Sequence, residues 1–374
     1  MRFHPITAMV EPIDEYRKGG YHPVHIGDEF HNGRYKVLAK LSFGASSTIW
    51  LARDNQGPHR EITLKIHRAS ASKNNQELTM HQHLSNSPHS HQHAGRAHIT
   101  ELLDHFYVNG PNGTHLCLVF PATVADLQTM MTSNHPRTAN EVRCLSRQIL
   151  RGLGLLHRVG IVLCDLRPGN IMIAAPAQKS HLDALQPAVC LPVEWRDGVQ
   201  VDDTAPRYLV QSQRYPFLVE REEQEEGFER VVVVIGDLGG AQWINQCDEV
   251  PVTELSMRAP EVIGGGWWDE RADIWGLGCL IYELATNRPL FSVDTRGVSE
   301  ERIDEQHLAL IERRVGADAL QAFAVRLGNR LPKDFGVEHV KRLAEFLWLM
   351  LQIGPTRRWS VGELLETPFI VGRY

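Results

Sequence analysis

Several short segments near the start of the chain are typical of β-strands, and one of them, 61–67, alternates apolar and polar residues like a half-buried strand. These segments span residues 35–40, 47–52, 61–67, 99–107 and 114–120. A strong turn sequence, Asn109-Gly-Pro-Asn-Gly, separates the last two, and residues 74–84 look helical. The pattern therefore predicts five strands and one helix within roughly the first 120 residues.

The hydrophobic period changes to that of helices after Asp126. Between Glu141 and Arg158, apolar residues recur about every 3.6 positions. Further helices are expected over 272–283, 305–315, 337–351 and 361–365, and a buried β-branched strand over 231–235. A β-rich part meets an α-rich part near residue 121, which predicts an α+β fold.

Two stretches fit neither pattern. Residues 1–33 are polar and punctuated by glycines, and they predict an extended leader. Residues 174–230 are rich in proline, glutamine and charge, and they predict a partly ordered insertion. The insertion ends in the acidic run 220–226, which is either a solvated surface or a dock for a basic peptide.

Composition narrows the class of protein. The 374 residues are 43% hydrophobic and 22% charged, as in soluble globular proteins. A net charge of -6 argues against nucleic acid as the main partner and suits a basic substrate. The six cysteines form no C-x-x-C pair, and no signal peptide or membrane-spanning run is evident. We expect a protein of the cytosol or nucleus that has no structural zinc.

The stretch 161–173 carries the most distinctive chemistry. Two short apolar runs flank a polar turn that Pro168 and Gly169 impose. Asp165 and Asn170 lie on this turn, where an acid can orient a hydroxyl nucleophile and an amide oxygen can hold a hard cation. The alternative is an ordinary Asx-type turn between two strands.

The predicted sheet holds three more candidates. The turn between the first two strands is built from small residues, which let backbone N–H groups approach phosphate oxygens. Lys65 lies on an alternating strand, and Glu77 lies on the following helix within reach of it. The alternatives are an ordinary hairpin turn, a snorkelling lysine and a solvated glutamate.

Two acidic residues follow in the second half. Asp237 comes directly after the buried strand and is flanked by glycines, so its carboxylate can turn into a cleft or merely start a turn. Glu261 ends the sequence Met257-Arg-Ala-Pro-Glu.

A histidine-rich segment offers a different interpretation. Six histidines lie between residues 81 and 98, namely His81, His83, His89, His91, His93 and His98. Imidazole is a common metal ligand, but no carboxylate or cysteine is interleaved. A non-kinase α+β binding protein with a metal loop would explain this segment and would leave the ordered motifs to chance.

The candidates follow one another along the chain in a characteristic order: a small-residue hairpin, Lys65, Glu77, Asp165, Asn170, Asp237 and Glu261. In this the chain resembles a eukaryotic protein kinase over about residues 30–370. It is most similar to the SR-protein kinase (SRPK) family, as a divergent member. That likeness rests on Gly19-Gly-Tyr-His-Pro-Val-His-Ile-Gly-Asp, Ser47-Thr-Ile-Trp-Leu-Ala-Arg-Asp, Asp237-Leu-Gly, Ala272-Asp-Ile-Trp, Glu283-Leu-Ala-Thr and the insertion.

The resemblance implies a two-lobed fold and a serine/threonine kinase that uses ATP and Mg²⁺. It implies an N-lobe over 34–120, a hinge and catalytic loop over 121–173, a spacer insertion over 174–230 and the rest of the C-lobe over 231–374. The ATP-covering hairpin would comprise Leu41, Ser42, Phe43, Gly44, Ala45, Ser46, Ser47, Thr48 and Ile49.

The resemblance also implies a role for each candidate. Lys65, held by Glu77, would contact the α- and β-phosphates, and Asp165 would act as the catalytic base. Arg167 would take the place of a lysine that contacts the γ-phosphate. Asn170 and Asp237 would hold Mg²⁺, and Glu261 would pair with Arg358. The expected partner is a basic, Arg/Ser-rich protein substrate related to splicing, with no membrane, no direct nucleic acid and a monomeric kinase.

The chain departs from the family pattern at several positions. Ser42 replaces the first glycine of the hairpin, Leu163 the histidine of His-Arg-Asp, and Arg167 the usual lysine. Gly169 and Pro121 also stand at unusual places. These departures support an alternative, a pseudokinase with a docking or scaffold role. The short segment from Asp237 to Glu261 predicts constitutive activity if the chain is an active kinase.

Overall fold

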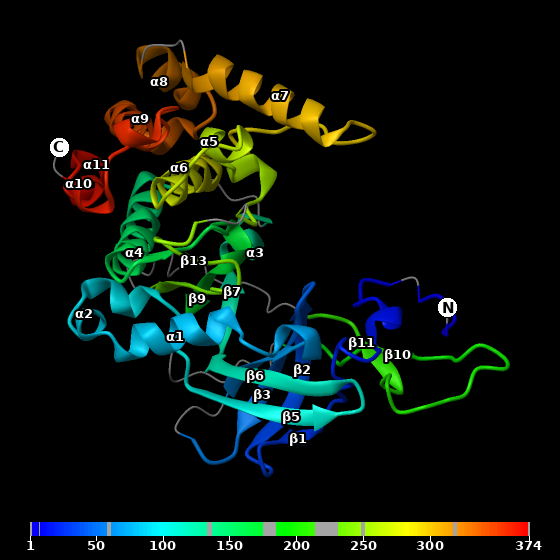
Figure 1. The fold of residues 1–374 in the computed structure, drawn as a ribbon. Helices are drawn as coiled ribbons and strands as arrows, with labels where there is room; N and C mark the ends of the chain where they lie inside the picture. The colour runs from blue at the N-terminus through cyan, green and yellow to red at the C-terminus, as the bar shows by residue number, and fades with distance from the viewer. Residues whose placement is uncertain are drawn as a thin grey trace. The chain divides into compact units, whose positions relative to one another are not determined.

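The computed structural model describes residues 2–6, 8–57, 61–132, 137–174, 185–213, 231–247, 251–316 and 320–372 (Figure 1). The chain forms two compact units. Unit 1 comprises Met1–Gln82, Thr100–Ala125 and Ala174–Leu218, and unit 2 comprises His83–Ile99, Asp126–Ile173 and Val219–Tyr374. The acidic run 220–226 lies outside the described residues.

Unit 1 is built on a six-stranded sheet with the order β1-β2-β3-β4-β6-β5. Its strands are β1 (Glu29–Phe30), β2 (Tyr35–Phe43), β3 (Ser47–Asp54), β4 (Glu61–His67), β5 (Asp104–Gly110) and β6 (Gly113–Pro121). All neighbouring strands are antiparallel. The alternating side chains of these strands bury Trp50, Leu64 and Val119 in one core cluster.

Helix α1 (Gln76–Asn86) packs across β6 (Figure 1). Leu78 of the helix joins Leu116, Leu118 and Phe120 of the strand in a second buried cluster. This packing fixes the face of α1 that carries Glu77. Two single-turn 3₁₀ helices, η1 (Ile13–Glu15) and η2 (Ala69–Ala71), complete the regular structure near this sheet.

The leader and the described part of the insertion fold together within unit 1. Strands β10 (Cys190–Pro192) and β11 (Tyr208–Val210) form an antiparallel hairpin. Phe3 forms a β-bridge with Trp195, and their rings lie 4.5 Å apart. Glu11 is buried and accepts hydrogen bonds from Tyr16 Oη, at 2.6 Å, and from Lys40 Nζ. The leader is therefore a packed part of unit 1 rather than a free extension.

Unit 2 is mainly helical. Its α-helices are α2 (Pro88–His91), α3 (Leu127–Thr132), α4 (Ala139–Arg158), α5 (Pro260–Ile263), α6 (Arg271–Thr286), α7 (Glu300–Ile311), α8 (Leu320–Gly328), α9 (Val337–Met350), α10 (Val361–Leu365) and α11 (Pro368–Val371). A π-helical turn, η9 (Glu312–Gly316), continues α7, and short 3₁₀ turns are η3 (Ala94–His98), η4 (Pro168–Asn170), η8 (Leu255–Met257), η10 (Lys333–Phe335) and η11 (Pro355–Arg357).

The buried helix α6 is the centre of this unit. A Cβ atom at Gly278 would lie 2.9 Å from the Leu351 side chain, so glycine allows α6 to approach the end of α9 closely. Trp275 is fully buried and stacks on Phe291 at a ring distance of 5.5 Å. Helix α4 begins with a capping box between Thr138 and Glu141.

Short strands frame the loops that carry the predicted site. In unit 2, β8 (Ile161–Val162) pairs with β13 (Gln242–Trp243), and β9 (Ile171–Ala174) pairs with β12 (Val233–Ile235). Strand β7 (Thr123–Asp126) follows β6 along the chain. The two antiparallel pairs place the loop 163–170 and the loop 236–241 at neighbouring strand ends.

Most predicted elements form, but several of their bounds differ. The sheet gains a short sixth strand, β1. Strand β5 begins at Asp104 rather than Ile99, because Ile99 is buried through a bridge to Ile235 in unit 2. Helix α7 begins at Glu300 rather than Glu305.

Residues 83–99, which the sequence places in the N-lobe, group with unit 2. A Cβ atom at Gly95 would lie 1.9 Å from the Arg151 carbonyl oxygen, so η3 lies directly against α4. His98 Nδ1 also bonds to the Val233 carbonyl at 3.0 Å. Over the described ranges, no helix has the length and apolar character needed to span a membrane.

Candidate active site

Unit 1 brings two of the predicted residues into direct contact. Lys65 on β4 and Glu77 on α1 are both buried, and Lys65 Nζ lies 2.9 Å from Glu77 Oε1 and 2.8 Å from Glu77 Oε2. His67 Nε2 lies 3.5 Å from the same carboxylate. A buried lysine that is held by a carboxylate is a fixed cation, not a snorkelling side chain.

The small-residue hairpin lies on the strand next to Lys65. Leu41, Ser42 and Phe43 end β2, and Ser47, Thr48 and Ile49 begin β3, with Ile49 directly opposite Lys65. The turn itself is Gly44, Ala45 and Ser46, all exposed, and Gly44 N–H donates to the Ser47 carbonyl at 2.9 Å. The turn can therefore present backbone donors on the same sheet that fixes Lys65.

In unit 2, the buried Asp273 holds the loop before Asp165; it belongs to the motif Ala272-Asp-Ile-Trp, but the sequence assigned it no role. Asp273 on α6 accepts hydrogen bonds from the N–H groups of Leu163, at 2.8 Å, and Cys164, at 2.9 Å. It also bonds His157 Nε2 at 2.9 Å. These bonds hold Cys164 in a left-handed conformation, with φ 65°, which is uncommon for a residue other than glycine.

Asp165, Asn170 and Arg167 converge on this loop. Asn170 Nδ2 donates to the Asp165 carbonyl at 2.9 Å and to Asp165 Oδ2 at 2.8 Å. Arg167 Nε donates to the same carboxylate oxygen at 3.2 Å. The turn is thus more than an Asx turn, because it aims an amide and a guanidinium at one carboxylate.

Asp237 lies close to this group. The Gly236 N–H donates to the Asn170 carbonyl at 2.8 Å, which ties the two loops together. Asp237 has a left-handed backbone, with φ 54°, and its Oδ1 accepts from the Gly239 N–H at 3.0 Å. Burial raises the pKa of Asp165 above its usual value, and the nearby Asp237 carboxylate adds to the rise, against the opposing effect of Arg167 and Asn170.

The side-chain oxygens of Asn170 and Asp237 are suitable ligands for a hard divalent cation. A carboxylate and an amide oxygen are ligands that Mg²⁺ accepts, and a cation would relieve the repulsion between the Asp165 and Asp237 carboxylates. Among the residues that the structure describes, no three or more His, Cys, Asp or Glu side chains are grouped to hold a metal. A cation here would need further oxygen ligands from water or from a bound phosphate, as is common for Mg²⁺.

The segment after Asp237 is fastened to the same loop. Thr253 Oγ1 donates to the Cys164 carbonyl at 2.6 Å, and Arg258 Nη2 donates to the Thr253 carbonyl at 3.2 Å. Burial raises the pKa of the Cys164 thiol, so this cysteine is a packed group rather than a reactive one.

The Glu261–Arg358 pair lies farther along unit 2. Arg358 Nη1 and Nη2 contact the two carboxylate oxygens of Glu261 at 2.6 and 2.7 Å, a bidentate arrangement. Both side chains are nearly fully buried, and the guanidinium lies 5.0 Å from the centre of the Trp275 ring. The contact is structural, because it joins α5 to the segment before α10.

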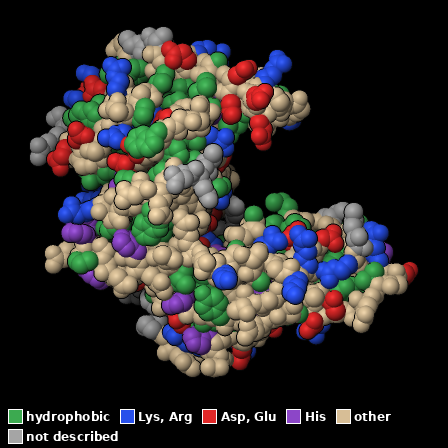
Figure 2. All heavy atoms as spheres, in the orientation of Figure 1, with side chains coloured by type: hydrophobic (Ala, Val, Ile, Leu, Met, Phe, Trp, Pro, Cys, Tyr) green, Lys and Arg blue, Asp and Glu red, His purple; other side chains and the backbone are tan. Residues whose placement is uncertain are grey.

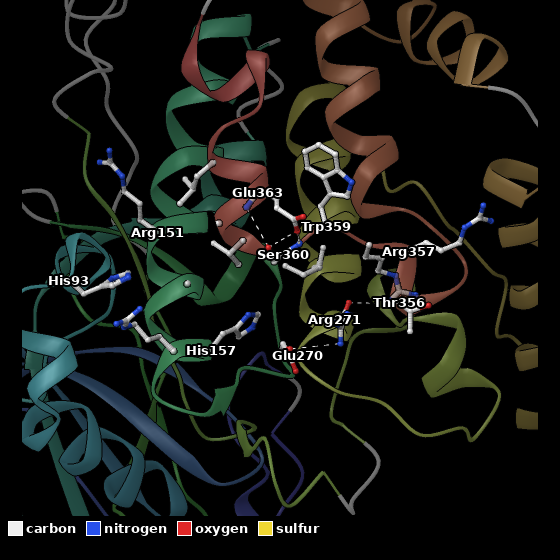
Figure 3. Close-up of a pocket in the computed structure, with 17 residues that line it drawn as sticks. His93, Arg151, His157, Glu270, Arg271, Thr356, Arg357, Trp359, Ser360 and Glu363 are labelled. Carbon is white, nitrogen blue, oxygen red and sulfur yellow. Dashed lines mark hydrogen bonds and ion pairs between the residues drawn. The ribbon is translucent and has the colours of Figure 1, made fainter.

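A pocket of about 650 Å³ also opens in unit 2, lined by residues that include His93, Arg151, His157, Glu270, Arg357 and Ser360. Arg358 and His93 line it, but Lys65, Asp165, Asn170 and Asp237 do not. Figure 3 shows Arg151 and Arg357 extending to opposite sides, while Ser360 is engaged by Glu363. The pocket is separate from the predicted site, because its lining includes none of Asp165, Asn170 and Asp237.

The histidine-rich segment is spread over several elements. His81 and His83 lie on α1, His89 and His91 on α2, and the others at η3. Figure 2 shows histidine side chains at several places on the face that it draws, and no three or more His, Cys, Asp or Glu side chains are grouped to hold a metal among the described residues. His98 Nδ1 is hydrogen-bonded to the Val233 carbonyl, and His93 accepts a hydrogen bond from the Gly95 N–H. This arrangement does not favour the metal-loop alternative.

Comparisons with known proteins agree with this geometry. A family model described as "Protein kinase domain" matches residues 35–183 and 217–370. The chain is 28% identical to the serine/threonine-protein kinase SRPK of Physarum polycephalum, over 96% of this chain and 91% of that protein. It is 27% identical to protein kinase dsk1 of Schizosaccharomyces pombe, over 96% of this chain and 85% of that protein.

A comparison with solved structures also indicates a kinase fold. The crystal structure of a kinase domain superimposes with a TM-score of 0.62 at 19% identity, covering 94% of this chain and 98% of the other. The β-rich unit 1 and helical unit 2 are the two parts expected of that fold. The chain belongs to the protein kinase family and is similar to its SRPK-type serine/threonine kinases.

Proposed function

We propose that this chain is an active kinase that transfers the γ-phosphoryl group of Mg²⁺-ATP to serine hydroxyls of basic, Arg/Ser-rich proteins. The observation that carries the proposal is the complete set of charged groups in fixed positions. Lys65 is locked to Glu77 in unit 1, and Asp165, Asn170 and Asp237 are gathered in unit 2. Phosphoryl transfer needs positioning and charge neutralisation more than covalent chemistry, so these groups suffice.

Each side chain has a definite task in this proposal. Asp165 accepts the proton of the substrate hydroxyl, and its carboxylate is oriented for this by Asn170. Lys65 binds the α- and β-phosphates, and Arg167 is placed beside Asp165 to meet the γ-phosphate. Mg²⁺, held by Asn170 and Asp237, would neutralise phosphate charge when bound.

Two carboxylates support a basic substrate. Glu254 follows Thr253, whose hydroxyl contacts the loop of Asp165. Burial raises the pKa of Glu283 on α6 to about 7, and the nearby carboxylate of Glu254 contributes to the rise. A substrate arginine placed beside this pair would relieve the repulsion between the two carboxylates. The net charge of -6 acts in the same direction over longer range.

A steady-state assay tests the substrate class. We expect purified protein with Mg²⁺-ATP to phosphorylate an Arg/Ser-repeat peptide with a kcat/KM at least about ten-fold above that for an Ala/Ser repeat of equal length, since one charge pair is worth roughly that factor. The Glu254→Gln variant should lose most of this preference. Equal rates on both peptides would contradict the basic-substrate proposal.

The same assay separates the pseudokinase alternative. This alternative draws on the departures at Ser42, Leu163, Arg167 and Pro121. No turnover on any peptide, together with a rise in melting temperature on addition of Mg²⁺-ATP, would favour a nucleotide-binding scaffold. The absence of both turnover and a rise in melting temperature would contradict nucleotide binding altogether.

We also expect activity that needs no phosphorylation of the segment 237–261. Kinase activation loops are commonly ordered by pairing a phosphate with arginine, whereas position 164, before the catalytic aspartate, is a buried cysteine here. Thr253 instead fastens the segment through its hydroxyl. Phosphatase-treated protein should therefore keep its full turnover within about two-fold. A loss of turnover that returns after incubation with Mg²⁺-ATP would contradict this.

A further inference from the structure

The leader, residues 1–33, contacts the turn 44–46 of the small-residue hairpin. Its path is set by Gly20, where a Cβ atom would lie 1.8 Å from the Glu15 carbonyl oxygen. The carbonyls of Gly19 and Gly20 accept hydrogen bonds from the N–H groups of Ser70, at 2.9 Å, and Ala69, at 3.0 Å. These contacts dock the leader on η2, the 3₁₀ turn that follows β4, and leave Tyr21 beside the hairpin turn.

Tyr21 contacts the turn itself. Its side chain is buried, and Tyr21 Oη donates a hydrogen bond to the Gly44 carbonyl at 2.7 Å. Burial raises the pKa of Tyr21, which keeps the phenol protonated as a donor at neutral pH. The Arg68 guanidinium lies 5.0 Å from the centre of the Tyr21 ring and holds the ring in place.

Arg68 donates hydrogen bonds to the next two carbonyls of the turn. Its Nη1 donates to the Ala45 carbonyl at 3.1 Å, and its backbone N–H donates to the Ser46 carbonyl at 2.8 Å. Its Nη2 contacts the Glu15 carboxylate of the leader. Three successive turn carbonyls, at residues 44, 45 and 46, are therefore each held by a donor of Tyr21 or Arg68.

Holding these carbonyls also fixes the direction of the backbone N–H groups. A peptide unit is planar, so the C=O of one residue and the N–H of the next point in opposite directions. The N–H groups of Ala45 and Ser46 thus point away from Tyr21 and Arg68, and neither donates to a backbone carbonyl in the part of the chain that the structure describes. Successive backbone N–H groups in a turn can bind an anion.

We propose that Tyr21 is a positioning residue for nucleotide binding, which fixes the 44–46 turn so that its N–H groups are pre-organised for ATP phosphates. The proposal rests on the proposed function, because it assumes that ATP lies under this hairpin. It also explains how the turn works with Ser42 and Ser47 in place of flexible glycines. A turn that is held from outside does not depend on glycine to reach its binding conformation.

The Tyr21→Phe variant tests this inference, because it removes one hydroxyl and keeps the buried ring. Titration calorimetry of the full chain with ATP and with adenosine measures the effect. We expect the Kd for ATP to rise about three- to ten-fold, the range of one hydrogen bond, and the Kd for adenosine to change less than about two-fold. In turnover assays, KM for ATP should rise by a similar factor while kcat stays within about two-fold.

The Tyr16→Phe variant is the matched control. Tyr16 is a buried tyrosine of the same leader, but its hydroxyl bonds to Glu11 rather than to the turn. It should lower the melting temperature and leave both Kd values unchanged. Tyr21→Phe protein that binds ATP like the wild type, or that loses ATP and adenosine equally, would overturn the inference. Wild-type protein that binds no ATP would overturn the proposed function and the inference with it.

Discussion

Replacing Asp165 with asparagine should reduce kcat by about a thousand-fold, which is the middle of the range for loss of a general base. The substitution keeps the shape of the side chain and the bond from Arg167 Nε, at 3.2 Å, but removes the group that accepts the proton. ATP affinity should change little, because Lys65 and Glu77 lie in the other unit. The measurement is single-turnover phosphorylation with saturating Mg²⁺-ATP.

Asp294→Asn is the control for this prediction. Asp294 is an exposed aspartate of unit 2 that pairs only locally, with Arg296, and its replacement should leave kcat unchanged. If Asp165→Asn kept more than about a tenth of wild-type turnover, Asp165 would not be the catalytic base.

The pH dependence provides a second measurement of the same role. A general base must be ionised, so the wild-type kcat/KM should fall as pH drops through the pKa of Asp165. Because burial and Asp237 raise that pKa, the fall should occur at a higher pH than an ordinary aspartate would give. The acid limb should be absent from the residual activity of Asp165→Asn.

Local patterns were enough to predict the paired elements of the site. An alternating strand followed by a helix places Lys65 opposite Glu77 at short range, and the observed contact of 2.8 Å confirms this pair. The bidentate Glu261–Arg358 contact confirms the other predicted pair, although it follows from the family resemblance rather than from spacing. The glycine-flanked Asp237 likewise lies at the end of β12, as its sequence context indicates.

Contacts that join distant segments could not be predicted in this way. Asp273 supports the Asp165 loop from more than a hundred positions away, and although its motif Ala272-Asp-Ile-Trp carries the family resemblance, helical spacing does not indicate which loop it contacts. The docking of Phe3 on Trp195 joins the leader to the insertion, and both segments are too irregular to show a period. The Tyr21 contact with Gly44 belongs to the same class, since only the motif Gly19-Gly-Tyr hints that this part of the leader is constrained.

Replacing Arg358 with methionine should destabilise unit 2 by roughly 3–5 kcal/mol, the cost of leaving a buried charge without its partner. The substitution leaves the Glu261 carboxylate buried and unpaired. It also removes donors to the carbonyls of Gln352, at 2.8 Å, and Arg271, at 2.9 Å. The measurement is the midpoint of thermal unfolding followed by circular dichroism, where a drop of several degrees is expected.

The neighbouring residue offers a matched control, because Arg357 is exposed and makes no ion pair within the described residues. Arg357→Met should shift the midpoint by less than about a degree, as surface changes rarely exceed 0.5 kcal/mol. The double variant Glu261→Gln/Arg358→Met should lose less unfolding free energy than the sum of the losses in the two single variants, because it leaves no unpaired charge. Equal midpoints for Arg358→Met and Arg357→Met would show that the ion pair contributes nothing to stability, contrary to its burial and bidentate geometry.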